Sequence, residues 1–103
     1  MYRATTPTIT FNIPVDLTEA SEVYVTFAYQ GGVLTKTSES LTITTSSVAV
    51  YLSQEETLTL PVGEVTAQIN WLYEEEGAIK RACSNIIKVN ISRNLIDEVL
   101  PNA

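Results

Sequence analysis

Apolar and polar residues alternate along much of the chain, most clearly between Glu64 and Glu74. The side chains that fall on one face of this run are Val65, Ala67, Ile69, Trp71 and Tyr73. A period of two over about nine residues is typical of a strand with one buried side. The run also contains the only tryptophan of the chain, whose large apolar area we expect to dominate a small core. It therefore predicts the central strand of a β-sandwich.

Shorter alternating runs predict further strands, at 8–13, 22–30, 33–37, 41–44, 48–52 and 78–92. Gly31-Gly32 and Glu76-Gly77 predict two-residue hairpin turns, because such turns need positive φ and glycine adopts it freely. Ile86 is out of phase with the apolar residues that follow it. We therefore predict a bulge near Ser84-Asn85 that switches the phase of the last strand.

Two stretches predict single helical turns between strands. Asp16 is placed to cap a turn that contains Glu19. Ser53 and Glu56 have the spacing of a capping box, in which each side chain satisfies the backbone amide of the other. Residues 1–6 show no periodicity, and we expect them to form a loose arm.

The C-terminal segment breaks the strand pattern. Its apolar residues are Leu95, Ile96, Val99 and Leu100, spaced to share one side of a short helix. The chain as a whole predicts an all-β, immunoglobulin-like β-sandwich of about seven strands, with one or two short helical turns and a short C-terminal helix. Residues 1–93 would form the sandwich and residues 94–103 an apolar tail.

Charge and composition narrow the possible partners. The chain has 103 residues, which suits one domain, and a net charge of −6 that would repel nucleic acid and anionic membranes. No apolar run approaches the roughly 20 residues that span a bilayer, and the first residues lack the apolar segment of a secretory signal. We therefore expect a soluble domain made in the cytoplasm, with neither nucleic acid nor membrane as a partner.

No motif in the sequence carries catalytic chemistry. Histidine is absent, which removes the commonest general base and metal ligand. Cys83 is the only cysteine, so it can neither form an internal disulfide nor build a zinc site. Glu74-Glu75-Glu76 is an acidic cluster that fits a solvated hairpin turn better than a calcium site. We expect no enzymatic activity, no catalytic residues, no metal site and no cofactor.

Candidate contact residues come from two places. Tyr24 and Tyr51 lie on the less apolar faces of their strands, so we expect them at an exposed contact surface. The apolar tail residues Leu95, Ile96, Val99 and Leu100 would be unfavourable in water, since burying such a side chain is worth about 1.5 kcal/mol or more. Two arrangements meet this need: the tail folds back on its own sandwich, or it docks onto a neighbouring subunit.

A family resemblance covers nearly the whole chain. The motifs that carry it are YRATTPTITF (2–11), VYVTF (23–27), VLTKT (33–37), LSQEETL (52–58), GEVTAQINW (63–71) and IIKVNISRNLIDEVL (86–100). In this order they resemble small immunoglobulin-like proteins encoded beside tail genes in prophages of Gram-positive gut bacteria, and the N-terminal domain of phage baseplate upper proteins. The long fibrous or receptor-binding regions of baseplate proteins have no counterpart here, which weakens the case for direct host-receptor binding.

The resemblance implies a non-enzymatic phage structural protein, a tail or baseplate component that acts through protein–protein contacts. Its partners would be other tail or baseplate subunits, a homo-oligomer being possible, and its final location the virion. The alternative is a carbohydrate-binding or adhesion module of a bacterial surface protein. That alternative predicts a planar aromatic row on one sheet, with a sugar or calcium contact near Tyr24 or Tyr51.

Overall fold

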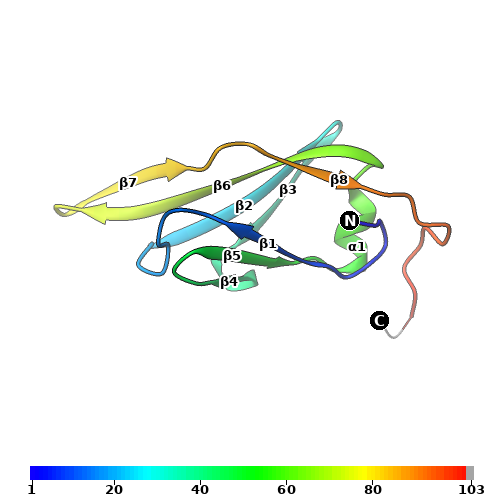
Figure 1. Cartoon of the computed structure of the whole chain (residues 1–103), viewed down its shortest axis with the longest axis horizontal. Coiled ribbons are helices and arrows are strands. Elements are labelled where there is room, and N and C mark those ends of the chain that lie inside the picture. Colours follow the sequence, from blue (N-terminus) through cyan, green and yellow to red (C-terminus); the bar gives the residue numbers. More distant parts are fainter. Residues whose placement is uncertain (102–103) are drawn as a thin grey trace.

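The computed structural model describes residues 1–101, in which two β-sheets face each other across an apolar layer (Figure 1). The strands are β1 (Thr8–Asn12), β2 (Glu22–Tyr29), β3 (Gly32–Thr37), β4 (Leu41–Ile43), β5 (Ser47–Tyr51), β6 (Gly63–Glu75), β7 (Ala78–Cys83) and β8 (Ile87–Ile91). The helical elements of this part of the chain are the 3-10 turn η1 (Ser38–Ser40) and the helix α1 (Gln54–Thr59). The described residues are thus mostly β, as the alternating pattern predicts.

The strand β6 organises the larger sheet. One sheet has the order β1-β5-β4, and the other has the order β3-β2-β6-β7, with β8 also paired to β6. Along one edge β6 pairs with β2, and along the other it pairs first with β8 and then with β7. The prediction of a central strand between Glu64 and Glu74 is therefore confirmed.

The predicted bulge separates β7 from β8. Asn70 of β6 pairs with Cys83, and Ala67 pairs with Ile87, so three residues oppose two between these partners. The amide of Ser84 donates to the carbonyl of Ile69 at 2.8 Å, and the Ser84 hydroxyl accepts from the Ile69 amide at 3.0 Å. This extra residue switches the phase of the strand, so the long final strand of the sequence pattern is two strands in the structure.

The hairpin turns follow the glycines, with one correction. The β6–β7 loop is Glu76-Gly77, with φ of 51° and 80°, as predicted. In the β2–β3 hairpin, however, Tyr29 pairs with Gly32, so the loop is Gln30-Gly31 rather than Gly31-Gly32. Gly31 has a φ of 110°, whereas Gly32 already belongs to β3.

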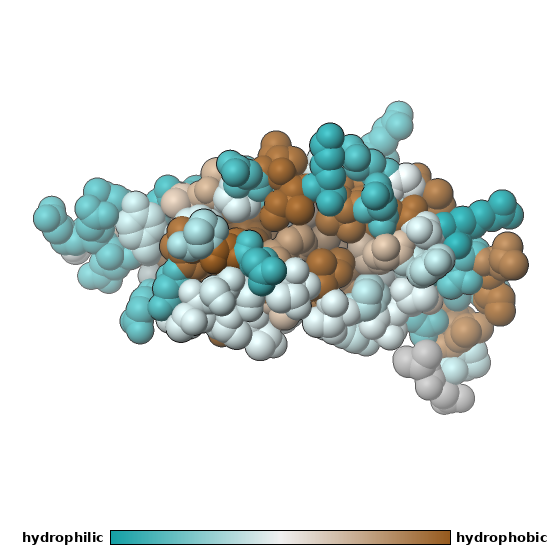
Figure 2. Space-filling view, viewed as in Figure 1, coloured by the Kyte–Doolittle hydropathy of each residue, from teal (hydrophilic) through white to brown (hydrophobic). Residues whose placement is uncertain are grey.

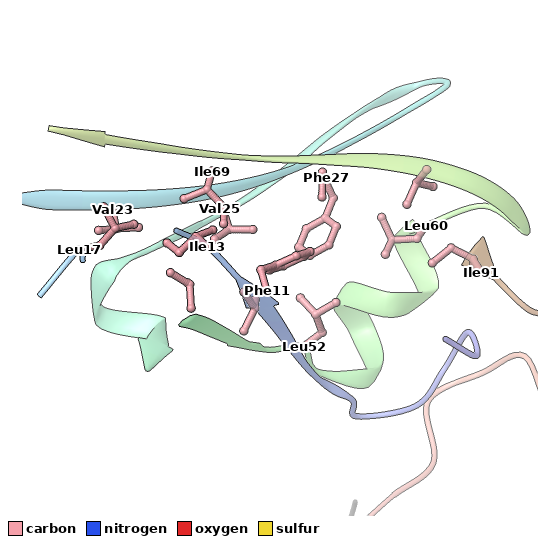
Figure 3. Close-up of a cluster of buried hydrophobic side chains, with 14 residues drawn as sticks. Phe11, Ile13, Leu17, Val23, Val25, Phe27, Leu52, Leu60, Ile69 and Ile91 are labelled. Atoms are coloured by element: carbon pink, nitrogen blue, oxygen red, sulfur yellow. The ribbon is translucent and has the colours of Figure 1, made fainter. Parts of the chain in front are cut away.

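The core is centred on phenylalanine instead of tryptophan. Phe27 is 0% exposed, and its ring centroid lies 6.3 Å from that of Phe11, which reaches it from the opposite sheet (Figure 3). Trp71, predicted to dominate the core, is only half-buried and packs against its margin. The reason is the length of β6: its inward face is buried at Val65 and Ile69 but not beyond, because the facing strands are much shorter.

Other local predictions have mixed outcomes. Ser53 and Glu56 form the predicted capping box at the start of α1. Asp16 accepts hydrogen bonds from Thr18, but the predicted helical turn is wrong, because the segment forms only a hydrogen-bonded turn. Residues 1–6 are not a loose arm: Tyr2 bridges to Ser92.

The predicted short C-terminal helix is wrong. Residues 94–101 contain no helix, and residues 102–103 of the predicted tail lie outside the described part of the chain. The Asn94 side chain accepts a hydrogen bond from the amide of Ile96 at 3.2 Å, which favours a turn over a helix start. A segment of about seven residues is also too short to remain helical without an apolar surface to pack on.

Candidate functional site

The C-terminal segment exposes its apolar side chains at one end of the molecule. The exposed fractions are 90% for Leu95, 54% for Ile96, 43% for Val99 and 45% for Leu100. Figure 2 shows apolar surface at the end where Figure 1 places this segment. These four tail residues, which the sequence predicts to make contacts, therefore lie near one another in the chain and face solvent.

Polar contacts hold the backbone of this segment in place. The Gln54 side chain donates to the carbonyl of Leu100 at 3.1 Å and accepts from its amide at 2.8 Å. Arg3 forms an ion pair with Asp97, and the Asn94 side chain donates to the Arg3 carbonyl at 3.0 Å. The tail thus returns to α1 and the N-terminal arm, but its apolar side chains stay exposed instead of being buried against the sandwich.

Arg3 joins three parts of the chain. Besides its pairing with Asp97, its Nε donates to the carbonyl of Leu60 at 2.8 Å and its Nη2 to that of Leu58 at 2.7 Å. These carbonyls lie at the C-terminal end of α1, where a positive charge is favourable. Arg3 therefore links the N-terminal arm, the helix and the C-terminal segment. No pattern in the sequence predicts this role.

The two candidate tyrosines do not form one surface. Tyr24 lies between the buried residues Val23 and Val25 of β2, so its half-buried ring is on the outer face of the larger sheet. Tyr51 follows buried Val50 in β5 and is 52% exposed on the outer face of the smaller sheet. Because the two outer faces point in opposite directions, the structure separates these residues from each other.

A hollow that sequence reasoning missed opens beside Trp71. It has a volume of about 560 Å³ and lies between the β1–β2 connection and the inward face of β6. Trp71 and Tyr73 contribute its aromatic surface, and its lining also includes Asp16, Glu19 and Glu74. The sequence does carry a signal for this hollow. The alternating run around Trp71 is longer than every other alternating run except 78–92, which the bulge interrupts.

Two carboxylates have shifted pKa values. Hydrogen bonds from the hydroxyl and amide of Thr18 lower the pKa of Asp16. Partial burial raises the pKa of Glu56, but hydrogen bonds from Lys36 and from the Ser53 amide outweigh it and leave the pKa below its ordinary value. Both groups are therefore ionised at neutral pH, and neither is poised as a general acid.

The part of the chain that the structure describes, residues 1–101, has no metal-binding group, because no three or more Cys, Asp or Glu residues in this range could hold a metal ion. None of its helices is long and apolar enough to cross a membrane. Cys83 is an exposed free cysteine on β7.

Comparisons of the chain with protein-family models, with curated proteins and with solved structures give no match.

Proposed function

We propose that the chain is a non-enzymatic structural component of a phage or prophage tail or baseplate, and that it acts through protein–protein contacts. The observation that carries the proposal is the C-terminal segment, whose apolar side chains are exposed while Gln54 holds its backbone at Leu100 and Arg3 holds the side chain of Asp97. A segment already fixed in place loses less conformational entropy when a partner covers it.

The energetics favour a covered segment. Each of Leu95, Ile96, Val99 and Leu100 would contribute up to about 1.5 kcal/mol if a partner buried it, so the four together would supply part of the free energy that a stable contact needs. Exposed apolar residues that cluster in this way are typical of interaction sites. We propose another tail or baseplate subunit, or a second copy of the chain, as the partner.

The strand order supports an immunoglobulin-like assignment. In such sandwiches one sheet contains strands B, E and D, and the other contains C, F and G, with C′ added beside C in the variable type. The order β1-β5-β4 corresponds to B-E-D, and β3-β2-β6-β7 corresponds to C′-C-F-G. Under this assignment the place of the first strand, beside β1, is an unpaired edge within the described residues.

Light scattering of the purified protein tests the contact. The full chain is expected to form oligomers, and a chain that ends at Arg93 is expected to be a monomer. Because truncation also removes the contacts of Asp97, a full-length L95S/I96S variant is needed and should behave like the truncated chain. V33S, at a position that is 65% exposed on β3, is the matched control and should keep the oligomer. Equal masses for all four proteins would count against self-association.

Gene neighbourhood tests the phage assignment separately. Genes for a tail tube or tape-measure protein beside the coding sequence would support it. A cell-wall anchor or glycosidase gene in that position would support the adhesion alternative instead. Tyr24 and Tyr51 do not form a common aromatic row for that alternative, because they lie on opposite outer faces.

A further inference from the structure

The hollow beside Trp71 exists because the larger sheet is longer than the smaller one. β6 has 13 residues, whereas β1 and β5 have five each and β4 has three. The β6–β7 hairpin therefore extends past the end of the smaller sheet (Figure 1). Only the β1–β2 connection crosses this part of the sheet, where Leu17 is buried and the Ser21 amide donates to the carbonyl of Leu72 at 2.8 Å. The uncovered surface between this connection and the hairpin is the hollow.

The lining combines aromatic faces with negative charge. Trp71 and Tyr73 are half-buried, so part of each side chain remains open to a ligand. Asp16 and Glu19 supply acidic groups from the β1–β2 connection, Glu74 borders the hollow from β6, and none of the lining residues is basic. A cation stacked on an indole ring and hydrogen-bonded to carboxylates would satisfy both features at once.

Two basic residues of β7 lie near the hollow. Lys80 pairs with Tyr73 and so shares the face of the hollow, where its ammonium lies 3.5 Å from the carboxylate of Glu75. Arg81 pairs with Leu72 on the other face and donates to the side-chain oxygen of Asn70 at 3.0 and 3.2 Å. Both hydrogen bonds from Thr18 to Asp16 end on Oδ1, and within residues 1–101 no donor reaches Oδ2. The acidic groups of the hollow are thus available to an external cation.

We propose that this hollow binds an arginine side chain of a protein partner. Arginine fits better than lysine, because its planar guanidinium stacks on aromatic rings and pairs with carboxylates through two hydrogen bonds. A volume of about 560 Å³ holds such a side chain together with its neighbours in an extended peptide. The β6–β7 hairpin and the C-terminal segment lie at opposite ends of the molecule (Figure 1), and the hollow is lined from the hairpin side, so this site stands independently of the proposed tail contact.

Trp71 provides the measurement, because it is the only tryptophan of the chain and lines the hollow. The probe is the peptide acetyl-Gly-Arg-Gly-amide, titrated into the full chain while tryptophan fluorescence and backbone amide NMR shifts are recorded. The same peptide with citrulline, which is uncharged and nearly the same shape, is the matched ligand. We expect the arginine peptide to shift the Trp71, Ala20 and Ala82 signals and to bind about fivefold more tightly than the citrulline peptide.

Substitutions of acidic residues provide a second test of the proposal. E19Q keeps Trp71 and is expected to weaken binding of the arginine peptide about two- to fivefold, while E98Q, in the C-terminal segment, should leave its affinity unchanged. Equal binding of the arginine and citrulline peptides, or shifts located away from the hollow, would overturn the proposal. So would a disaccharide that shifts Trp71 more strongly than the arginine peptide does, since that result would assign the hollow to carbohydrate.

Discussion

Phe27 and Trp71 are large aromatic residues on adjacent strands, but only Phe27 is enclosed on all sides. Phe27 faces the smaller sheet, where Phe11 of β1 meets it. Trp71 lies two residues beyond buried Ile69, past the point where the facing sheet ends. Position along β6, rather than side-chain size, therefore decides how much each ring contributes to stability.

The first prediction compares these two aromatic residues. We expect F27A to lower the free energy of unfolding by about 3–5 kcal/mol, because it leaves a cavity in the core. W71A should lower it by roughly half as much, since its ring is only partly removed from water in the folded chain. Urea unfolding followed by far-ultraviolet circular dichroism measures both variants without relying on tryptophan. Equal losses would contradict the placement of Trp71 at the margin of the core.

The second prediction concerns Glu56, whose carboxylate oxygens lie 2.7 and 2.9 Å from Lys36 Nζ. Its pKa is lower in the folded chain than in the unfolded one, so ionised Glu56 stabilises the fold above the ordinary glutamate pKa. This stabilisation is lost as the pH falls through the lowered pKa. E56Q keeps a capping side chain but should lower stability at neutral pH by up to about 1 kcal/mol.

Urea unfolding at several pH values checks this prediction. Between about pH 5 and about pH 3, the free energy of unfolding should fall less steeply for E56Q than for the wild type. E55Q removes the same charge from an exposed position of the same helical turn and serves as the control. Parallel curves for E56Q and the wild type would contradict the role of the Lys36 contact.

At the scale of elements, turns and irregularities set the register of the larger sheet. The Gln30-Gly31 loop joins β2 to β3, and the extra residue near Ser84 divides the last strand into β7 and β8. The alternating pattern located both features within a residue or two. It placed the first hairpin one residue too late, because adjacent glycines give no signal of which one adopts positive φ.

The third prediction separates these glycines. G31A should destabilise the protein by about 1 kcal/mol or more, because a φ of 110° is strained for any residue with a Cβ. G32A should have a smaller effect, since its φ is ordinary and its Cβ would meet the end of the Tyr29 side chain, whose hydroxyl oxygen is the nearest atom at 3.3 Å. Thermal unfolding of both variants provides the measurement. A larger loss for G32A would place the turn where the sequence pattern predicts it.

At the scale of the whole molecule, the two ends of the chain meet beside α1. The arm around Arg3, the helix and the C-terminal segment are linked by hydrogen bonds between residues far apart in the sequence. Gln54 is only 5% exposed, and both polar atoms of its amide bind the backbone of Leu100. This arrangement holds the exposed apolar side chains at one end, whereas the β6–β7 hairpin, from whose side the hollow is lined, lies at the other.

The fourth prediction tests this link. Q54A should release the C-terminal segment, so that the amides from Leu95 to Leu100 exchange hydrogen faster while the amides of β6 remain protected. The free energy of unfolding should fall by about 1–2 kcal/mol, because two hydrogen bonds are lost and little apolar area is uncovered. Hydrogen exchange measured by NMR distinguishes the two regions. Q30A, in the exposed β2–β3 loop, is the control and should leave the tail unchanged.

Local features of this protein were determined by the sequence alone, because they depend on neighbours within a few residues. The strands, the capping box of Ser53 and Glu56, the Glu76-Gly77 turn and the bulge near Ser84 all follow from alternation and turn chemistry. The tertiary structure decided the features that depend on contacts between residues far apart in the sequence. It placed Trp71 at the margin of the core, past the shorter facing strands. It also extended the C-terminal segment where the sequence pattern predicted a helix, because Gln54 binds the backbone of Leu100 and Arg3 binds the side chain of Asp97.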